Sequence, residues 1–220
     1  MNKFKYPRTL HLPWSKTITV DDKRFNMRQC FDTFSGKEVV VTEKLDGENT
    51  TIYGDCSTHA RSLEGAFHES RAWMRGFAPT LGYKLPTGWR VCGESLYAKH
   101  SVQYMTLPSY FIAFAIYDEN NVCLSWDDFV EMCDKLDVIH APLLFRGVLS
   151  VSDLQKELAP RFSAPAKSAY GPMTEGYVMR LTESYPWSEQ SKCLAKYVRA
   201  NHVQSDSHWM HSRVIKNCLA

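Results

Sequence analysis

The amino-acid sequence predicts an α+β fold of antiparallel sheets flanked by helices. Short runs rich in valine, isoleucine, tyrosine and phenylalanine dominate the chain, with helical patterns between some of them. These runs and helices do not alternate in the regular way that produces a parallel βαβ fold. No repeat, low-complexity segment or long glycine- and serine-rich linker divides the 220 residues, so we expect one domain.

Seven strands are expected in order along the chain. The run YFIAFAIY at 110–117 is the longest apolar stretch, and it is far too short to span a bilayer. The predicted strands cover residues 38–43, 50–53, 89–96, 110–117, 143–146, 176–181 and 193–198.

Four helices are expected between and after these strands. The second is opened by Ser125 and Asp128, which have the spacing of a capping box. The last has only a weak apolar pattern. The predicted helices cover residues 67–77, 127–136, 151–158 and 205–216.

Composition limits the possible functions and the compartment. Twenty-six Lys and Arg against 24 Asp and Glu leave a formal charge of +2, so nucleic-acid contact requires a local basic face. The seven cysteines include no CxxC pair, and their odd number favours a reducing compartment over a disulfide framework. We expect a soluble, cytoplasmic protein without membrane contact. The sequence contains neither a P-loop nor a GxGxxG motif, so we do not expect nucleotide binding through either of these phosphate-binding loops.

Lys44 is a candidate covalent nucleophile. It lies in the run EKLDGEN at 43–49, after the apolar residues 39–41 and before a glycine turn. With an ordinary pKa of about 10.4, a lysine is neutral in only about one part in a thousand or less near pH 7, so attack needs partial burial or a neighbouring cation. Taken alone, the K-x-D-G string also fits a surface lysine at a strand end.

Four later segments supply side chains that suit such a nucleophile. Glu94 ends a strand in a Gly-Glu pair, and Phe114 lies in an aromatic strand that can present a ring to a base. Glu175 begins an apolar strand and offers oxygen to a divalent cation, while Lys196 offers a point charge to phosphate. Structural alternatives stay open, namely a turn acid for Glu94 and a core side chain for Phe114.

Six strings in this order resemble motifs I, Ia, III, IIIa, IV and V of the covalent nucleotidyltransferases, which include ATP-dependent DNA and RNA ligases and mRNA-capping enzymes. The strings are KLDG, ARS, GES, AFAIY, EGYVMR and AKYVR. The longer sequences around these motifs, such as KLDGENTT at 44–51 and GESLYAKHS at 93–101, are most similar to the RNA ligase branch. Within that branch the chain resembles the ligase domain of bacterial nick-sealing RNA ligases and their phage relatives.

The resemblance implies a nucleotidyltransferase (ATP-grasp-like ligase) fold and an ATP-dependent RNA ligase. Lys44 would form lysyl-AMP, AMP would pass to an RNA 5′-phosphate, and a 3′-hydroxyl would displace AMP. The implied cofactors are ATP and Mg²⁺, with Mn²⁺ as the alternative metal. The implied partners are RNA ends or a nicked duplex containing RNA, in the cytoplasm of a bacterial or phage-infected cell.

The same resemblance implies a role for each matching residue. Lys44, Lys196 and Glu175 would be catalytic, and Glu175 and Glu94 would hold the metal. Phe114 would stack on adenine and Arg61 would orient a phosphate or the RNA terminus. Asp46 is also open to interpretation as a turn residue only. The implied cofactor-binding set is Glu43, Asp46, Asn49, Arg61, Glu94, Phe114 and Lys196.

Departures from the family pattern leave some questions open. Val198 stands where many ligases carry a second motif V lysine, so either Lys192 or Arg199 is the candidate assistant of Lys196. We expect residues 1–220 to form a single adenylyltransferase domain with a short C-terminal segment at about 200–220 and no OB domain. RNA would then bind this domain itself or a partner protein. Two alternative functions remain, a capping-type guanylyltransferase and a non-catalytic module that binds nucleotide or RNA ends.

Overall fold

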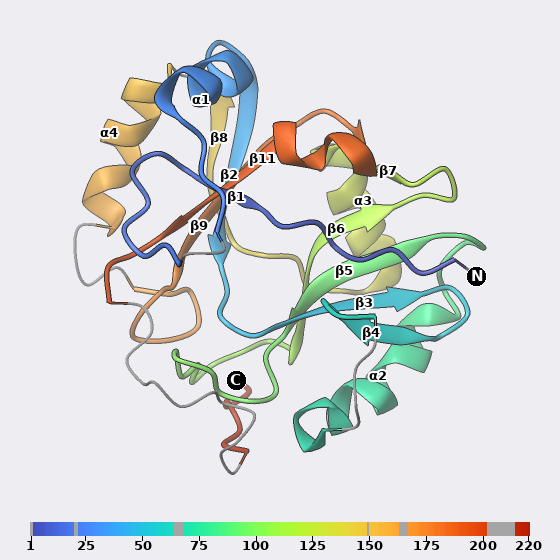
Figure 1. Ribbon diagram of the computed structural model, residues 1–220. Helices are drawn as coiled ribbons and strands as arrows, with labels where there is room; N and C mark the ends of the chain where they lie inside the picture. The colour runs from blue at the N-terminus through green and yellow to red at the C-terminus, as the bar shows by residue number, and fades with distance from the viewer. Residues whose placement is uncertain (1, 20–21, 64–67, 149, 163–166, 202–213) are drawn as a thin grey trace.

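Two sheets form the frame of the computed structural model, which describes residues 2–19, 22–63, 68–148, 150–162, 167–201 and 214–220. The first sheet has the order β1-β11-β9-β2-β8, and the second has the order β10-β7-β6-β5-β3-β4. All pairs are antiparallel except β1 with β11. The predicted α+β class with antiparallel sheets is therefore confirmed (Figure 1).

The seven predicted strands are all present, with ends that differ by a few residues. They are β2 (Glu38–Lys44), β3 (Glu48–Tyr53), β5 (Arg90–Ser95), β6 (Phe111–Tyr117), β8 (Leu143–Val148), β9 (Gly176–Leu181) and β11 (Leu194–Val198). Four further strands of two or three residues were not predicted: β1 (Leu10–His11), β4 (Thr58–Ala60), β7 (Val122–Cys123) and β10 (Tyr185–Pro186).

The helices agree less well with prediction. Helices α3 (Trp126–Leu136) and α4 (Val151–Phe162) confirm the expected segments, although α4 runs further. The segment expected as one helix at 67–77 is a 3-10 turn, η1 (Glu69–Arg71), followed by α2 (Ala72–Gly82). Most of the helix predicted at 205–216 lies outside the described residues, and the described part from 214 is not helical.

Helix α1 (Met27–Phe34) was not predicted, although its start signal is present in the sequence. Asn26 accepts a hydrogen bond from Gln29 N at 2.8 Å, and the Gln29 side chain accepts one from Asn26 N at 3.0 Å. This is a capping box with asparagine in place of serine or threonine. A second 3-10 segment, η2 (Trp187–Lys192), precedes β11.

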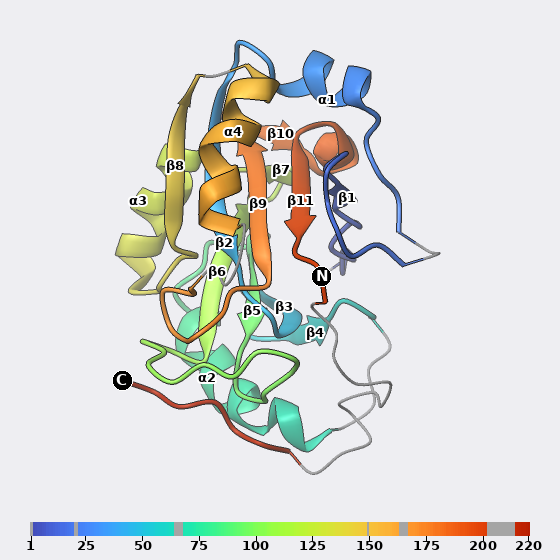
Figure 2. The ribbon, with the colours of Figure 1, turned by 90° about the vertical axis from the view of Figure 1, so that its left-hand side faces the viewer.

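Each sheet packs against its own pair of helices. One apolar cluster joins α1 and α4 to the first sheet through residues such as Phe34, Val39 and Val41. Another joins α2 and α3 to the second sheet through residues such as Leu81 and Phe129. In Figure 2, α4 covers β9 and β2 while α2 lies beneath the second sheet. None of the described helices is long and apolar enough to cross a membrane.

The last residues, 214–220, form an extended segment that we call the C-terminal strap. It bridges to Ala98 and Leu107, so it follows the loop at 97–108 between β5 and β6. Asn217 is buried and its amide donates to Leu96 O at 2.8 Å and accepts from Tyr104 N at 2.9 Å. The strap therefore holds this loop in place by hydrogen bonds from both backbone and side chain.

Candidate active site

Lys44 ends β2 at the junction of the two sheets. The register of β2 with β9 pairs Lys44 with Gly176, which places the preceding residue, Glu175, beside the lysine. Lys44 Nζ donates to Glu175 Oε2 at 2.6 Å, and both side chains are largely buried. Gly176 is required at this crossing, because a Cβ there would lie 2.0 Å from Tyr197 O on β11.

The charge state of Lys44 is set by the acids around it. Burial by itself lowers the pKa of Lys44, but the carboxylates of Glu175, Glu94 and Asp46 outweigh burial and raise that pKa above its ordinary value. Partial burial is present as expected, yet it does not produce a neutral amine. The lysine is a paired ammonium in the absence of ligand.

Glu94 faces Lys44 from the second sheet. It lies on β5 opposite Asn49 of β3, and its Oε1 accepts from Gly47 N at 3.1 Å. Burial, opposed by Lys44 and reinforced by Glu175, raises the pKa of Glu94 to about 8. A large share of Glu94 is therefore protonated near neutral pH.

A β-bulge directs Phe114 toward the site. Ala113 pairs with Gly93 and Ala115 pairs with Cys92, so Phe114 between them has no partner on β5. Bulges of this kind change the direction of a side chain relative to strict alternation. Phe114 is the one residue of β6 that is not fully buried, and its ring meets that of Tyr6 edge-on at 5.1 Å.

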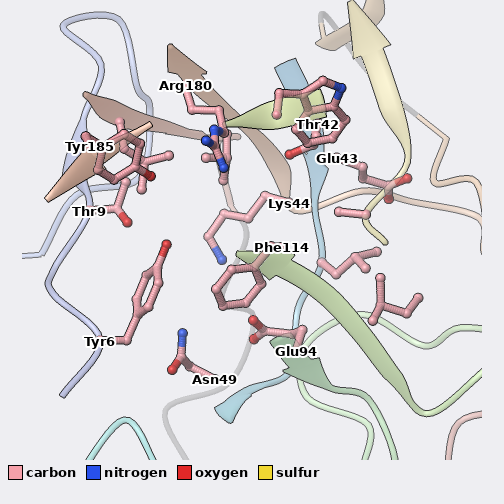
Figure 3. A pocket seen from close by; sticks show the side chains of 16 residues that line it. Tyr6, Thr9, Thr42, Glu43, Lys44, Asn49, Glu94, Phe114, Arg180 and Tyr185 are labelled. Atoms are coloured by element: carbon pink, nitrogen blue, oxygen red, sulfur yellow. The ribbon is translucent and has the colours of Figure 1, made fainter. Parts of the chain in front are cut away.

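A small pocket, which we call the inner pocket, lies between the sheets next to Lys44. Figure 3 shows Lys44 reaching between Tyr6, Phe114 and Glu94. Its volume is about 110 Å³ and its walls are mainly apolar and aromatic. Its lining includes Lys44 and five other polar or aromatic side chains close to it, namely Tyr6, Glu43, Asn49, Glu94 and Phe114.

Two polar atoms at the inner pocket have no partner among the described residues, Asn49 Oδ1 and Glu43 Oε1. The other Glu43 oxygen accepts from Ala169 N at 2.9 Å, and burial raises the pKa of this carboxyl. Buried polar atoms are normally hydrogen-bonded. These two are therefore suited to contact a ligand.

A wider opening, which we call the outer cleft, continues from the inner pocket. It has a volume of about 520 Å³ and shares Tyr6, Thr9, Lys44, Asn49 and Glu94 with the inner pocket. Its walls carry four cationic side chains against two carboxyls, Glu48 and Glu94. The four are Lys44, Arg61, Arg71 and Lys196.

Lys196 is held at the outer cleft by a carboxylate. Its Nζ lies 3.4 Å from Asp22 Oδ1. Burial and the nearby Lys44 charge lower the pKa of Lys196, and Asp22 opposes this change. The β11–β9–β2 pairing places Lys196 and Lys44 on the same sheet, so both cations meet the same space.

Neither candidate assistant of Lys196 lines the two cavities. Lys192 is exposed and pairs with Glu189 at 2.6 Å. Arg199 donates to the backbone oxygens of Thr174 at 2.8 Å and Ala200 at 3.1 Å. The additional cations of the outer cleft are instead Arg61 and Arg71. The sequence predicts Arg61 as a site residue and offers Arg71, at the start of an amphipathic helix, only as an alternative phosphate contact.

Asp46 is placed differently from the other predicted cofactor residues. Its carboxylate accepts from Ser101 N at 2.8 Å and Val102 N at 2.7 Å, and its backbone N donates to Tyr104 OH at 2.8 Å. It lines neither cavity. These contacts tie the turn after Lys44 to the loop that the C-terminal strap holds.

The acids next to Lys44 suit a magnesium-type cation. Within the described ranges, no group of three or more His, Cys, Asp or Glu side chains forms a complete metal site. Mg²⁺ commonly uses only one or two carboxylates and completes its shell with water and substrate phosphates. Glu175 and Glu94 are two such oxygen donors, and they flank Lys44.

Known proteins resemble the chain in sequence family and in fold. A family model described as RNA ligase matches residues 37–198, whereas no curated protein sequence matches. A similar solved structure is Naegleria gruberi RNA ligase with PPi, with 18% identity, a TM-score of 0.54, and coverage of 90% of this chain and 61% of that chain. A second similar structure is an archaeal ATP-dependent RNA ligase, form 1, with 16% identity and a TM-score of 0.52. The match covers 76% of this chain and 44% of the archaeal chain.

The solved structures and the family model support different conclusions about the chain. At these identities the solved structures show a common fold, and the chain spans less than two thirds of the length of either relative. The family match covers most of the chain and includes every residue of the predicted site from Glu43 to Lys196. The chain therefore belongs to the RNA ligase family.

Proposed function

We propose that the chain is an ATP-dependent RNA ligase that acts through Lys44. The observation that carries this proposal is the position of Lys44 where a small, mainly apolar pocket meets a wider cationic cleft. Such a junction suits a nucleotide whose base is enclosed and whose phosphates face the cations. Family membership supports the same activity, and related Naegleria gruberi ligase structures are described as containing ATP and Mn.

The inner pocket would hold the adenine base. Phe114 offers a partly exposed ring, and Tyr6 meets it edge-on to form one wall. Stacking on an aromatic face is available to any base, so selection needs polar contacts as well. The unpartnered oxygens of Glu43 and Asn49 are acceptors suited to the amino group of adenine or to the ribose.

The first chemical step would form a bond between Lys44 Nζ and the α-phosphorus of ATP. The bond from that phosphorus to the pyrophosphate oxygen breaks, and pyrophosphate leaves through the outer cleft toward Arg61 and Lys196. Nζ must first lose a proton, and Glu175 Oε2 at 2.6 Å is the nearest acceptor. The product is a lysyl-AMP phosphoramidate, as the motif resemblance implies.

Glu175 and Glu94 would hold the divalent cation, Mg²⁺ or Mn²⁺. When bound, that cation would neutralise the carboxylates that raise the pKa of Lys44 and would offset the charge of the phosphates. Lys196 and Arg61, which line the outer cleft, would add fixed positive charge. Phosphoryl transfer depends chiefly on such positioning and charge stabilisation.

The second and third steps would use an RNA 5′-phosphate and a 3′-hydroxyl. A 5′-phosphate oxygen attacks the AMP phosphorus, the P–N bond to Lys44 breaks, and the amine regains its proton. The 3′-hydroxyl then attacks the activated 5′-phosphorus and releases AMP. RNA ends are the substrate class, and we propose a nicked duplex containing RNA as the form used in the cytoplasm, with a partner protein adding RNA contacts.

Covalent labelling tests this proposal directly. The protein is incubated with divalent cation and α-labelled ATP or GTP and then denatured. We expect an acid-labile label from ATP in the wild type and in the control K135A, whose exposed lysine lies on α3, and none in K44A. Label from GTP alone would support a capping-type guanylyltransferase, and no label from either nucleotide would support a non-catalytic module.

Joining assays then separate the substrates. The wild type is given a nicked duplex, with RNA or DNA on the 3′-hydroxyl side, or single-stranded RNA with a 5′-phosphate. We expect sealing of the nicked duplex that carries RNA. Sealing of single strands at an equal rate would overturn the duplex preference while leaving the ligase activity intact.

A further inference from the structure

A second depression continues outward from the outer cleft along the edge of the second sheet. We call it the side groove, and it runs between β3, β4 and the start of α2. It has a volume of about 270 Å³ and shares Glu48, Ala60 and Arg71 with the outer cleft. The two openings are therefore neighbours with a common wall, and a chain leaving the cleft can pass into the groove.

An ion pair forms the boundary between the two openings. Arg71 Nε donates to Glu48 Oε2 at 2.8 Å, and Nη2 donates to the other oxygen of the same carboxylate. Both side chains are mostly buried, and Glu48 raises the pKa of Arg71. This bidentate pair fixes the start of β3, four residues after Lys44, against the end of η1, just before α2 begins.

The side groove has a lining of mixed polarity and carries a further cation, Arg75. Arg75 lies in the first turn of α2, and it lines the groove together with Arg71, the residue that precedes this helix. His68 Nδ1 lies 3.2 Å from Ser70 N and 2.7 Å from Ser70 Oγ, so Nε2 is the ring nitrogen that a ligand in the groove would meet. Thr50 and Thr58 line the same groove.

His59 belongs to the floor of the side groove and not to its binding groups. It is buried, its Nε2 lies 2.9 Å from Tyr53 OH, and its Nδ1 contacts Ala60 O. Burial lowers its pKa, so the ring is neutral at physiological pH. Arg75 and His68 are thus the groups that a ligand in the groove would meet.

We infer that the side groove binds the sugar–phosphate backbone of the RNA strand whose 5′-phosphate receives AMP. This inference rests on the proposed function. The 5′-phosphate must approach the AMP phosphorus from the outer cleft, where pyrophosphate leaves. The nucleotides behind it must then exit past Arg71, and the adjoining opening offers Arg75 and His68 to the next phosphate and ribose.

The lining chemistry favours a backbone over a base or a folded protein partner. Arginine and histidine donors with threonine hydroxyls match phosphate oxygens and the 2′-hydroxyl. Among the described lining residues, the groove offers no aromatic ring other than its histidines for base stacking. The groove therefore positions the strand without reading its sequence.

The test compares wild type with R75A and with H68A in separate steps of the reaction. Lys44 labelling by ATP is measured without RNA, and AMP transfer is then measured from the labelled enzyme to 5′-phosphorylated RNAs of increasing length. We expect R75A to label at the wild-type rate but to bind long RNA more weakly. The slope of log affinity against log salt should fall in magnitude by about 0.7, the value for one phosphate contact on a single strand.

A matched control and a length series make the outcome decisive. R28A removes an arginine that is 91% exposed on α1, away from the groove, and should leave both affinity and salt slope unchanged. In the wild type, affinity should increase as nucleotides are added behind the 5′-phosphate, and R75A and H68A should lose part of that increase. Wild-type affinity and salt slope in R75A and H68A would overturn the inference.

Failure of the ligase proposal can be distinguished from failure of the groove proposal by the labelling step. If the wild type takes no label from ATP, the ligase proposal fails, and the groove is tested by the fluorescence anisotropy of a 5′-phosphorylated RNA alone. Equal salt slopes for wild type and R75A in that measurement would reject the groove as well. Loss of labelling in R75A without RNA would also contradict it, because Arg75 would then act on the nucleotide site.

Discussion

Glu94 should make the stability of the protein fall as pH rises from 5 to 8. Its pKa is raised to about 8 by burial and by the neighbouring acids, against an ordinary value of 4.5. Between these values the unfolded chain releases a proton that the folded chain keeps. The free energy of unfolding therefore decreases with pH across this window and levels off above it.

The size of the effect follows from the distance between the two pKa values. A difference of about 3.5 pH units at about 1.36 kcal/mol each corresponds to at most about 5 kcal/mol. Glutamine in place of Glu94 cannot ionise, but its oxygen can still accept from Gly47 N. Relative to wild type, E94Q should therefore gain about 3 to 4 kcal/mol between pH 5 and pH 8, because the transition is incomplete at both ends of this window.

Urea unfolding followed by tryptophan fluorescence at several pH values measures this difference. The control is E189Q, which changes a half-exposed glutamate paired with Lys192 on η2 and should follow the wild-type profile. Titrating groups far from Glu94 affect all three proteins alike and cancel in the comparison, and Lys44 beside it stays protonated throughout this pH range. A constant difference between E94Q and wild type from pH 5 to 8 would refute the reasoning about Glu94.

Three other substitutions test the packing and the pocket. Gly176→Ala places a Cβ 2.0 Å from Tyr197 O, so it should lower the free energy of unfolding in urea by more than about 3 kcal/mol. The control is Gly76→Ala in α2, where a Cβ meets open space. It should raise the free energy of unfolding by up to about 1 kcal/mol. Asn217→Ala removes buried hydrogen bonds from the loop and should cost about 2 to 3 kcal/mol in the same assay. Phe114→Ala should raise the KM for ATP in Lys44 labelling about three- to ten-fold through lost ring stacking, and an unchanged KM would exclude the stacking role.

The strands and the order of the motif residues could be predicted from the sequence because both depend on local patterns. Apolar β-rich runs located all seven long strands. The helix α1 was missed although Asn26 and Gln29 carry its capping box. Strands of two residues such as β1 and β10 have no pattern of their own, since they exist only through pairing with a partner strand.

The geometry of the site depends on contacts that no local pattern reveals. Tyr6 enters the inner pocket from an irregular N-terminal segment, and Arg71 enters the outer cleft through its pairing with Glu48. The bulge that turns Phe114 inward arises from the pairing of β5 with β6. The raised pKa of Lys44 likewise needs three carboxylates from separate segments.

The C-terminal strap is synthesised after all of the motif residues, and this order matters for activity. The motif residues from Lys44 to Lys196 all leave the ribosome before the strap does, at about 5 to 20 residues per second. Until Asn217 emerges, the loop that anchors Asp46 lacks its hydrogen bonds to the strap. A nascent or truncated chain that stops soon after Lys196 would carry every residue that we propose to contact the nucleotide, yet it would lack the hydrogen bonds that hold the loop at 97–108.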